Sequence, residues 1–569
     1  MAPEFACPIH HGCTPGTFIE AAASRPPGQA RLGGVYKSRR VIPPQPEGAT
    51  QKSDMGARLP GTMPDSDAHP GKRPVDRAGT AIIVVAAALA AGITLYQLSR
   101  PGLLFGITPD ISVWIGASIR LVHGAIPYRD FDLIQPPGFT LLATPFAALS
   151  EWIGTRDALA VLRLGTPLLS AGSVILVGTV IRHRGRSALI VACGVMAFFP
   201  AEVYALRSGL LESVVDFFCL AGLALIFDGD GFTSSRRRLL FGGVAFGIAG
   251  LVKSPAIVPV LVVFVLCLPE IRRRLVPFLV GVAAGFGVPT LPFFLLAPGS
   301  FIRDVLSPLS YIPVASRVSI SARLGELTGV FAFGGSALVA IAGTVVLIAI
   351  VIAAFALPPR RKPSPLEWFA ISATALAALA QLGPAYYFPQ YAAFMAPFLA
   401  LLLGISLARL VAERSPRVAL AIATTGVSVL CISQLVAIPG VAAPDIAAVV
   451  DGVIPPGACV LSDAPSKLVT TNRFVAAPSG CNTMIDPQGA TLSYGYGSAG
   501  AEHLWTNEVE RSDYMVTSTR FAIWDIPPDA ALRAYVSANF QLVRDGGLLF
   551  YVRNGFPHGD GAGAAPGSR

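Results

Sequence analysis

Charged residues are scarce in this sequence of 569 residues, because Asp, Glu, Lys and Arg together make up only 14%. An average soluble domain has roughly 25%. Hydrophobic residues reach 53%, and the mean hydropathy is +0.61. Even a large globular protein must cover its surface with polar side chains, so this composition excludes an ordinary soluble protein. The sequence therefore predicts a polytopic membrane protein that is mainly α-helical.

Three other signals are missing from the chain: a cleavable signal peptide, a glycine-rich nucleotide-binding loop, and a cysteine spacing typical of metal sites or disulfide frameworks. Residues 1–77 are rich in Pro, Gly, Ser, Arg and Lys, and we expect a disordered cytoplasmic tail there. Within this tail, the two Cys and two His between Cys7 and Cys13 are more closely spaced than the ligands of structural zinc sites. An idle tail is therefore favoured over a metal site.

Apolar segments of spanning type follow the tail, and basic runs separate many of them. The segments are Thr80–Leu98, 157–181, 187–206, 211–228, 239–253, 255–270, 275–297, 331–357, 367–387, 390–410 and 418–439. The basic runs lie at 182–186, 236–238, 272–274, 360–362 and 409–417, and each should be cytoplasmic by the positive-inside rule. Lys253-Ser254-Pro255 divides two short segments that could form a re-entrant pair. We favour two spans, because basic runs flank both outer ends.

The topology requires an odd number of crossings between the outer end of the first span, near Gln97, and the cytoplasmic run at 182–186. Only 157–181 is long enough for a hydrocarbon core of about 30 Å, since Pro137–Ile153 is short and contains Pro145. We expect Pro137–Ile153, and also Ile111–His123, to be interfacial helices on the outer surface. This gives eleven spans within residues 78–440 and places the C-terminus outside.

Residues 441–555 have a different character, with 11 acidic and 7 basic side chains and no spanning segment. Strand-like runs occur at 459–461, 514–516 and 548–552, and Asp529–Asn539 is helix-like, so we expect a small extracytoplasmic α/β domain. Its two cysteines, Cys459 and Cys481, could form a disulfide outside the cell or remain free. Residues 556–569 are rich in Gly, Ala and Pro, and we expect a disordered tail.

Acidic side chains gather in the loop at residues 100–136, which contains Asp110, Asp130 and Asp132. Carboxylates beside a membrane are costly unless they are solvated or used. Asp110 could be a catalytic group or only the N-cap of the following helix, and the two roles can coexist. Asp130 and Asp132 could be solvated turn residues, and His123 is better explained as a helix end than as a general base.

The sequence at this loop resembles the first outer loop of the C-type membrane glycosyltransferases, in the protein mannosyltransferase and aminoarabinose transferase branch. The resemblance is carried by Asp110, the Gly-x-x-Pro-Tyr-Arg-Asp-Phe run at 124–131 and Pro136-Pro137-Gly138. Three later landmarks also match across residues 80–440: the second outer loop at 204–212, the Lys-containing turn at 250–255 and the aromatic-proline turn at 386–397. All of them fall on the outer side in the topology derived from charge.

The resemblance implies an enzyme that transfers a sugar from a polyprenyl-phosphate donor to an acceptor hydroxyl of a glycan, lipid or protein on the extracytoplasmic face. It implies that Asp110 is the catalytic base, because the attacking hydroxyl must lose its proton. Cationic or hydrogen-bonding groups would hold the leaving phosphate. The candidate substrate-binding residues are Arg129, Asp130, Gln135, Arg207, Glu212, Lys253, Arg317, Arg323 and Tyr391.

Two departures from the family pattern qualify this assignment. Ile111 follows Asp110 where many relatives have a second acid, so we expect no obligatory metal and no other cofactor. Gln135 stands where the aminoarabinose branch has a Lys before the Pro pair, so another cation must hold the phosphate, or the acceptor differs.

Several of these candidates also have a structural explanation. Glu212 could stabilise a helix start, Lys253 could extend from a span end towards water, and Tyr391 could belong to an interfacial aromatic belt. Arg317 and Arg323 could be solvated. The alternative functions are a transporter or lipid flippase without covalent chemistry, and a catalytically inactive relative that serves as a scaffold. A transporter should have polar residues in opposed mid-membrane halves, which the sequence does not show.

Overall fold

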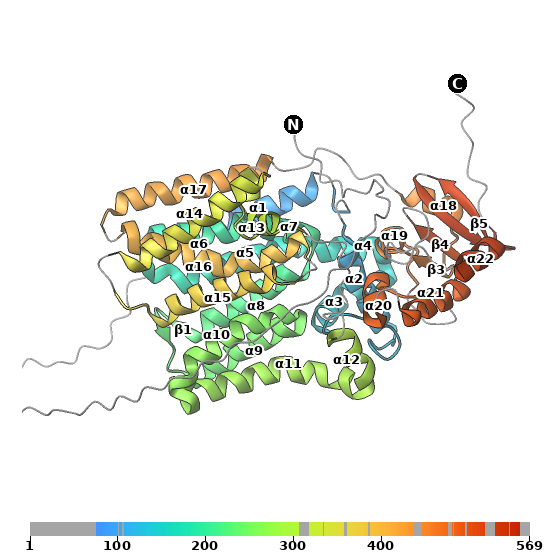
Figure 1. Ribbon diagram of the computed structural model, residues 1–569, viewed down its shortest axis with the longest axis horizontal. Helices are drawn as coiled ribbons and strands as arrows, with labels where there is room; N and C mark the ends of the chain where they lie inside the picture. Colours follow the sequence, from blue (N-terminus) through green and yellow to red (C-terminus); the bar gives the residue numbers. More distant parts are fainter. Residues whose placement is uncertain are drawn as a thin grey trace, which may run out of the picture. The chain divides into compact units, whose positions relative to one another are not determined.

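The computed structural model is mostly helical, and Pro74–Arg569 forms one compact unit (Figure 1). The residues described are 76–100, 102–104, 107–306, 318–333, 335–357, 361–384, 387–412, 414–436, 446–475, 481, 483–495, 498–517, 530–545 and 547–557. The expected N-terminal tail up to residue 75, with its Cys7–Cys13 cluster, lies outside these ranges, as do Arg317, Tyr386 and residues 558–569.

Seventeen helices are described before residue 440. They are α1 (Arg77–Ser99), α2 (Pro109–Val122), α3 (Gly138–Ala148), α4 (Ser150–Leu164), α5 (Thr166–Ile181), α6 (Arg186–Phe198), α7 (Pro200–Ser208), α8 (Leu211–Ile226), α9 (Arg236–Val252), α10 (Ile257–Cys267), α11 (Val276–Leu296), α12 (Pro298–Leu306), α13 (Ile320–Leu327), α14 (Ala337–Ala356), α15 (Pro365–Leu382), α16 (Ala396–Leu407) and α17 (Pro416–Val436). Short elements between them include η1 (Arg182–Arg184), β1 (Phe227–Asp228), β2 (Gly231–Phe232), η2 (Ser254–Ala256), η8 (Pro389–Met395) and η9 (Ala408–Ala412).

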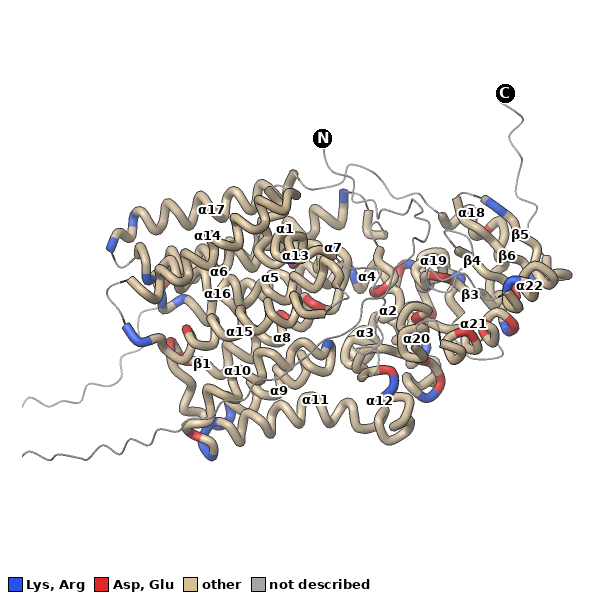
Figure 2. The backbone as a smooth tube through the Cα atoms, viewed as in Figure 1, with Lys and Arg blue, Asp and Glu red and all other residues tan. Residues whose placement is uncertain are grey.

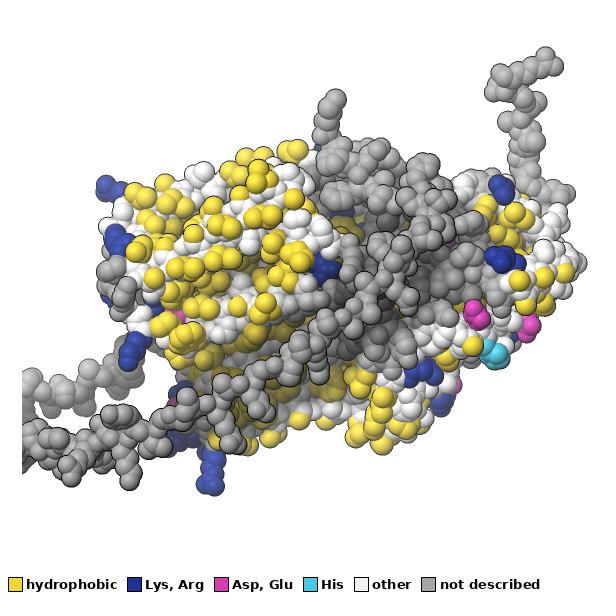
Figure 3. All heavy atoms as spheres, in the orientation of Figure 1, with side chains coloured by type: hydrophobic (Ala, Val, Ile, Leu, Met, Phe, Trp, Pro, Cys, Tyr) yellow, Lys and Arg dark blue, Asp and Glu magenta, His cyan; other side chains and the backbone are white. Residues whose placement is uncertain are grey.

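Within the described residues, seven helical segments are long and apolar enough to cross a membrane, or eight if the bent pair α6–α7 is one span. The expected count of eleven is therefore not confirmed. Part of the difference lies in Ser254–Leu296, which is one continuous helical run but contains two of the expected spans. In addition, α8 and α9 have only 16 and 17 residues. Hydrophobic side chains are spread widely over the visible, described surface of the helical part, as expected for a surface in contact with lipid (Figure 3).

Helix starts follow the local sequence signals. Ser364 and Glu367 form a complete capping box at the start of α15, and Ser336 caps α14 by accepting a hydrogen bond from the Val339 amide. At the other end of a helix, α9 stops at Val252, and Lys253 has an extended backbone before Pro255. The predicted break between the segments 239–253 and 255–270 is therefore present.

Helices α9 and α11 approach each other through glycines. A Cβ atom at Gly243 would overlap the Phe278 carbonyl, and one at Gly281 would overlap the Leu240 carbonyl. Gly247 and Gly285, four residues further along each helix, face backbone atoms in the same way. Two Gly-x-x-x-Gly pairs thus allow close backbone packing, which is how membrane helices associate without a hydrophobic driving force.

The basic runs lie at one set of helix ends (Figure 2). Helix α8 begins at Leu211 and leads after 16 residues to the turn that contains Asp230, next to the Arg184 of η1. Helix α9 begins at the basic run Arg236–Arg238 and ends beside Lys253. The residues Leu211 and Lys253 therefore occupy the helix ends opposite the basic runs.

Helix α2 corresponds to the expected interfacial helix Ile111–His123, but it is enclosed by protein. All ten residues from Ile111 to Arg120 are buried. The reason is that α3, α4 and the C-terminal region pack around it, with Phe474 and Ile485 against Gly116. Helix α3 has 11 residues and contains Pro145, so it is too short to cross the membrane alone.

The C-terminal region contains a four-stranded mixed sheet in the order β3-β4-β6-β5. Strand β3 is parallel to β4, and the pairs β4–β6 and β5–β6 are antiparallel. The elements are α18 (Ala447–Val453), β3 (Val460–Ser462), α19 (Ser466–Val469), α20 (Pro487–Tyr494), α21 (Ala499–Arg511), β4 (Tyr514–Thr517), α22 (Ala530–Asn539), β5 (Phe540–Asp545) and β6 (Leu548–Arg553).

Alternate residues of these strands form two separate hydrophobic cores, as a pleated sheet requires. Val460 and Val516 pack with α18, whereas Leu461 and Met515 pack with α21 and α22. The three strand-like runs and the helix expected near residues 529–539 are all present. Cys459 and Cys481 form a disulfide, which confirms the bonded alternative. The domain boundaries at 440 and 555 and the outer location remain predictions.

Candidate active site

A cleft lies where the non-basic helix ends meet the C-terminal region. Its empty volume is about 550 Å³, and side chains from six parts of the chain line it. They come from α2, the loop before α3, the start of α8, the α9–η2 turn, η8 and α20. The lining residues are Asp110, Val113, Trp114, Ile134, Gln135, Leu210, Leu211, Glu212, Lys253, Phe388, Tyr391, Asp486, Gln488 and Leu492. Five of the ten candidate site residues are among them.

Asp110 lies in the first turn of α2, but it is not the N-cap. Thr108 occupies the N-cap position, and Pro109 is the first residue of the helix. The Asp110 carboxylate instead accepts a hydrogen bond from Nε2 of Gln390 at 3.4 Å. A role limited to capping is therefore excluded. Burial raises the pKa of Asp110 to about 6, with a smaller increase from Glu212 and opposing effects of Lys253 and Gln390.

Lys253 and Glu212 form an ion pair next to Asp110. The Lys253 ammonium lies 2.5 Å from Oε1 of Glu212 and 4.3 Å from the centre of the Tyr391 ring. Both partners are largely buried, since their side chains are 14% and 4% exposed. The break after α9 places Lys253, while the first turn of α8 places Glu212. The carboxylate and the aromatic ring thus hold the ammonium group in one position beside the cleft.

Asp486 is a second buried acid in the cleft, and it was not among the residues predicted from the sequence. It caps α20, where its carboxylate accepts a hydrogen bond from the Gly489 amide at 2.8 Å. Burial raises the pKa of Asp486 to about 7, and the nearby charge of Asp110 adds to this effect. An Asp followed by Pro predicts a helix start, but no local pattern indicates that this cap faces Asp110.

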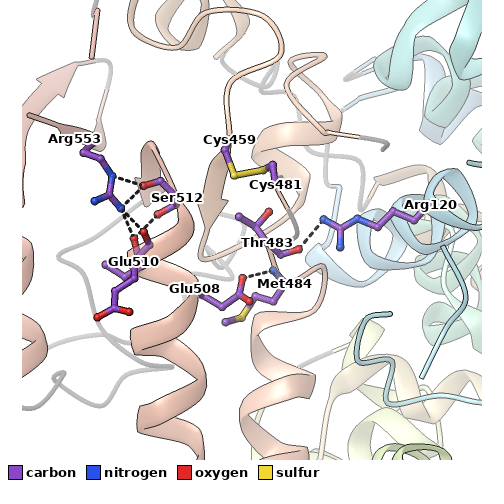
Figure 4. The surroundings of a disulfide bond; sticks show 10 residues. Arg120, Cys459, Cys481, Thr483, Met484, Glu508, Glu510, Ser512 and Arg553 are labelled. Atoms are coloured by element: carbon purple, nitrogen blue, oxygen red, sulfur yellow. Dashed lines mark hydrogen bonds between the residues drawn. A yellow bond between two sulfur atoms is a disulfide. The ribbon is translucent and has the colours of Figure 1, made fainter. Parts of the chain in front are cut away.

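The strap, which we define as residues 481 and 483–486, is fixed at three points (Figure 4). The disulfide joins Cys481 to Cys459. Arg120 of α2 donates to the Thr483 carbonyl at 2.6 Å, and the Met484 amide donates to Glu508 at 2.6 Å. Burial lowers the pKa of Arg120 to about 10 and raises that of Glu508 to about 7. Helix α2 therefore carries Asp110 and also holds the strap that positions Asp486.

The sequence matches the model of Glycosyltransferase family 87 over residues 134–383. The chain is a glycosyltransferase. The matched segment includes Gln135, Arg207, Glu212 and Lys253 but ends before Tyr391 and begins after Asp110. No curated protein sequence matches the chain.

Two crystal structures of ArnT from Cupriavidus metallidurans share the fold of this glycosyltransferase, each with a TM-score of 0.56. The structure bound to undecaprenyl phosphate is 16% identical and the apo structure 14% identical, and each match covers 83% of this chain and 98% of that chain. AglB from Archaeoglobus fulgidus, in complex with an inhibitory peptide and a dolichol-phosphate, is 11% identical with a TM-score of 0.44 over 84% and 74% of the two chains. The family match and the fold shared with ArnT confirm the expected resemblance to C-type glycosyltransferases.

Several candidate residues of the glycosyltransferase do not line the cleft. Arg129 and Asp130 are more exposed than Lys253 and Glu212, and they pair with each other at 2.8 Å. Asp130 also accepts a hydrogen bond from the Ile126 amide, so this pair closes the loop. The Arg207 guanidinium lies 5.5 Å from the centre of the Tyr204 ring in α7, outside the cleft lining.

Arg323 does not line the cleft, and its contacts are those of a structural residue. It is buried in α13, donates hydrogen bonds to the carbonyls of Gln381, Leu382 and Pro384, and stacks on the Tyr387 ring. These contacts hold the chain at the end of α15. Arg323 is therefore placed among backbone carbonyls, which excludes the solvated explanation, and its role in phosphate binding remains a prediction.

The charged residues described in the cleft lining carry an excess of negative formal charge. Among the described lining residues, Lys253 is the one cation beside three carboxylates, those of Asp110, Glu212 and Asp486. Within the same described part of the chain, no group of three or more His, Cys, Asp or Glu side chains is placed to hold a metal ion. The expectation that no metal is obligatory remains a prediction.

Proposed function

We propose that this enzyme transfers a sugar from a polyprenyl-phosphate donor to the hydroxyl of a glycan, lipid or protein acceptor, on the extracytoplasmic face. In the reaction, the acceptor oxygen attacks the anomeric carbon and loses its proton to Asp110. The bond between the anomeric carbon and the phosphate oxygen breaks, and its electron pair leaves with the polyprenyl phosphate. A single displacement of this kind inverts the anomeric centre.

Asp110 suits the role of general base on physical grounds. A carboxylate with a pKa near 6 is mostly ionised at neutral pH, yet it is a stronger base than a carboxylate in water. The hydrogen bond from Gln390 fixes the direction of the carboxylate. Its place at the cleft surface lets an acceptor hydroxyl approach, whereas Glu212 is occupied by Lys253.

Lys253 is the group that would stabilise the departing phosphate. Its ammonium can donate to a phosphate oxygen and also remain paired with Glu212, because it carries three hydrogens. Gln135, which replaces the Lys of the aminoarabinose branch, lines the same cleft and can add a neutral hydrogen bond. Asp486, with a pKa near 7, is about half protonated at neutral pH, which reduces the negative charge that faces the donor.

The outer location is supported by the distribution of charge along the helices. The cleft is lined by Glu212 at the start of α8 and Lys253 after the end of α9, at the helix end opposite the basic run that begins α9, and basic runs favour the cytoplasmic side. The transporter alternative is not retained, because the family match identifies a glycosyltransferase. An inactive relative that serves as a scaffold would transfer no sugar, whether or not Asp110 is present.

The convergence of Asp110 with the Lys253–Glu212 pair in one cleft is the observation that carries this proposal. The test is a transfer assay with purified enzyme in nanodiscs, a labelled polyprenyl-phosphate sugar and an acceptor extract from the cell envelope. We expect label transfer by the wild-type enzyme and a large loss with Asp110→Asn. An equal transfer rate in the two proteins would overturn the assignment of the base.

A further inference from the structure

A second pocket lies far from the cleft, at the basic helix ends. Its empty volume, which includes open solvent, is about 580 Å³, and it is formed by η1, the β1–β2 turn, the end of α14, the start of α15 and η9. Helix α8 runs between the two sites, because it starts at the cleft and leads to the β1–β2 turn. Its 16 residues span about 24 Å at 1.5 Å per residue, close to the thickness of a hydrocarbon core.

The lining of this pocket has a formal excess of three positive charges. Its charged residues are Arg184, Asp230, Arg361, Lys362, Glu367, Arg409 and Arg414. Such an excess, with several guanidinium groups, is suited to a phosphate group, because arginine can donate two parallel hydrogen bonds to phosphate oxygens.

Two of the arginines are held rigidly before any ligand binds. Glu367 is buried and pairs with Arg184 and Arg409 at 2.8 Å each. Arg184 also pairs with Asp230 at 2.6 Å, and the Arg409 guanidinium lies 4.4 Å from the centre of the Phe355 ring. The side chains of both arginines are at most 15% exposed. This wall is therefore preorganised, unlike a solvated surface cluster.

The remaining wall of the pocket is apolar and belongs to a lipid-facing helix. Ala353, Ala354 and Leu357 line the pocket at the end of α14. Helix α14 has the smallest buried share, 11%, among the spanning segments of the described residues. Its last turns expose Ile352 and Leu357 by 61% and 51%. Acyl chains must cover this face, so a ligand with an anionic head and an apolar tail fits both walls.

We propose that this basic pocket binds the phosphate head group of an anionic phospholipid, whose acyl chains lie along α14. The lipid would belong to the leaflet opposite the cleft, so it is not the sugar donor. The same phosphate chemistry could also come from free inorganic phosphate, and the test separates the two sources. This proposal does not depend on which sugar the enzyme transfers.

The experiment titrates the purified full-length protein in detergent with dioctanoyl phosphatidylglycerol, dioctanoyl phosphatidylcholine and inorganic phosphate, each followed by thermophoresis. The variant Lys362→Ala/Arg414→Ala removes two pocket charges. The control Arg236→Ala/Arg237→Ala removes two exposed charges from the start of α9, which do not line the pocket. Thermal unfolding without lipid checks that both variants are folded.

We expect phosphatidylglycerol to bind tightly and the other two ligands to bind weakly. The affinity for phosphatidylglycerol should fall by about fivefold for each cation removed in the pocket variant and should be unchanged in the control. Equal loss in the two variants would mean general surface electrostatics and would overturn the proposal. Equal binding of phosphatidylcholine would exclude recognition of the anionic head group. Phosphate that binds as tightly as the lipid would assign the pocket to a free anion instead.

Discussion

The substitution Asp110→Asn tests the proposed base with little change in structure. Asparagine has the same shape and can still accept the hydrogen bond from Gln390, so the cleft should keep its geometry. A positioned general base contributes roughly 100- to 10,000-fold to the rate of a proton-transfer step. We therefore expect the rate of sugar transfer to fall by about that factor, with little effect on donor binding.

The change of kcat/KM with pH is a second, independent test of Asp110 as the base. With a pKa of about 6, about 90% of Asp110 is ionised at pH 7 and about 10% at pH 5. The base acts only when ionised, so kcat/KM of the wild-type enzyme should fall about tenfold for each pH unit well below 6 and level off above it. The residual activity of Asp110→Asn should lack this acid limb.

The assay measures initial rates with a labelled polyprenyl-phosphate sugar at several pH values, for the wild type, Asp110→Asn and the matched control Asp157→Asn. Asp157 is an exposed carboxylate on α4 that does not line the cleft. If Asp110→Asn keeps the full rate, or keeps the acid limb near pH 6, Asp110 is not the general base. An equal loss with Asp157→Asn would show that the effect is not specific to the cleft.

Three further predictions concern the other parts of the site. Lys253→Met should lower kcat by at least about tenfold and leave the buried Glu212 unpaired, whereas an unchanged kcat would exclude Lys253 from phosphate stabilisation. The raised pKa of Asp486 means that the folded state retains a proton that the unfolded state loses. The free energy of unfolding should therefore fall by up to about 4 kcal/mol as the pH rises from about 4 to about 7. Asp486→Asn should flatten that dependence in thermal unfolding, and an unaltered slope would contradict the assignment. Replacing Cys459 and Cys481 by Ser should lower the unfolding free energy of the C-terminal region by about 3 kcal/mol, from the closed loop of 22 residues, which denaturant titration of the two proteins would measure.

Local sequence signals were sufficient for features that depend on a few neighbouring residues. The Pro255 break, the strands near 460, 515 and 550, and the basic helix ends all follow from such signals. The resemblance to C-type glycosyltransferases identified Asp110, Glu212 and Lys253, which the structure brings into one cleft.

Contacts between distant parts of the chain could not be predicted in this way. Asp486 lines the same cleft as Asp110 because Arg120 and the disulfide hold the strap against α2. The burial of α2 on all sides has the same cause, since nothing in its sequence indicates that Phe474 packs on Gly116. Arg323 lies among backbone carbonyls for a reason that only the fold provides.

The most direct test of the central claim is a cryo-EM structure of the enzyme in a nanodisc with a non-transferable polyprenyl-phosphate sugar analogue. We expect the analogue phosphate at about 3 Å from the Lys253 ammonium, with the Asp110 carboxylate facing the side of the anomeric carbon opposite the phosphate. A phosphate seated elsewhere, such as in the pocket beside Arg184, with the cleft empty, would contradict it.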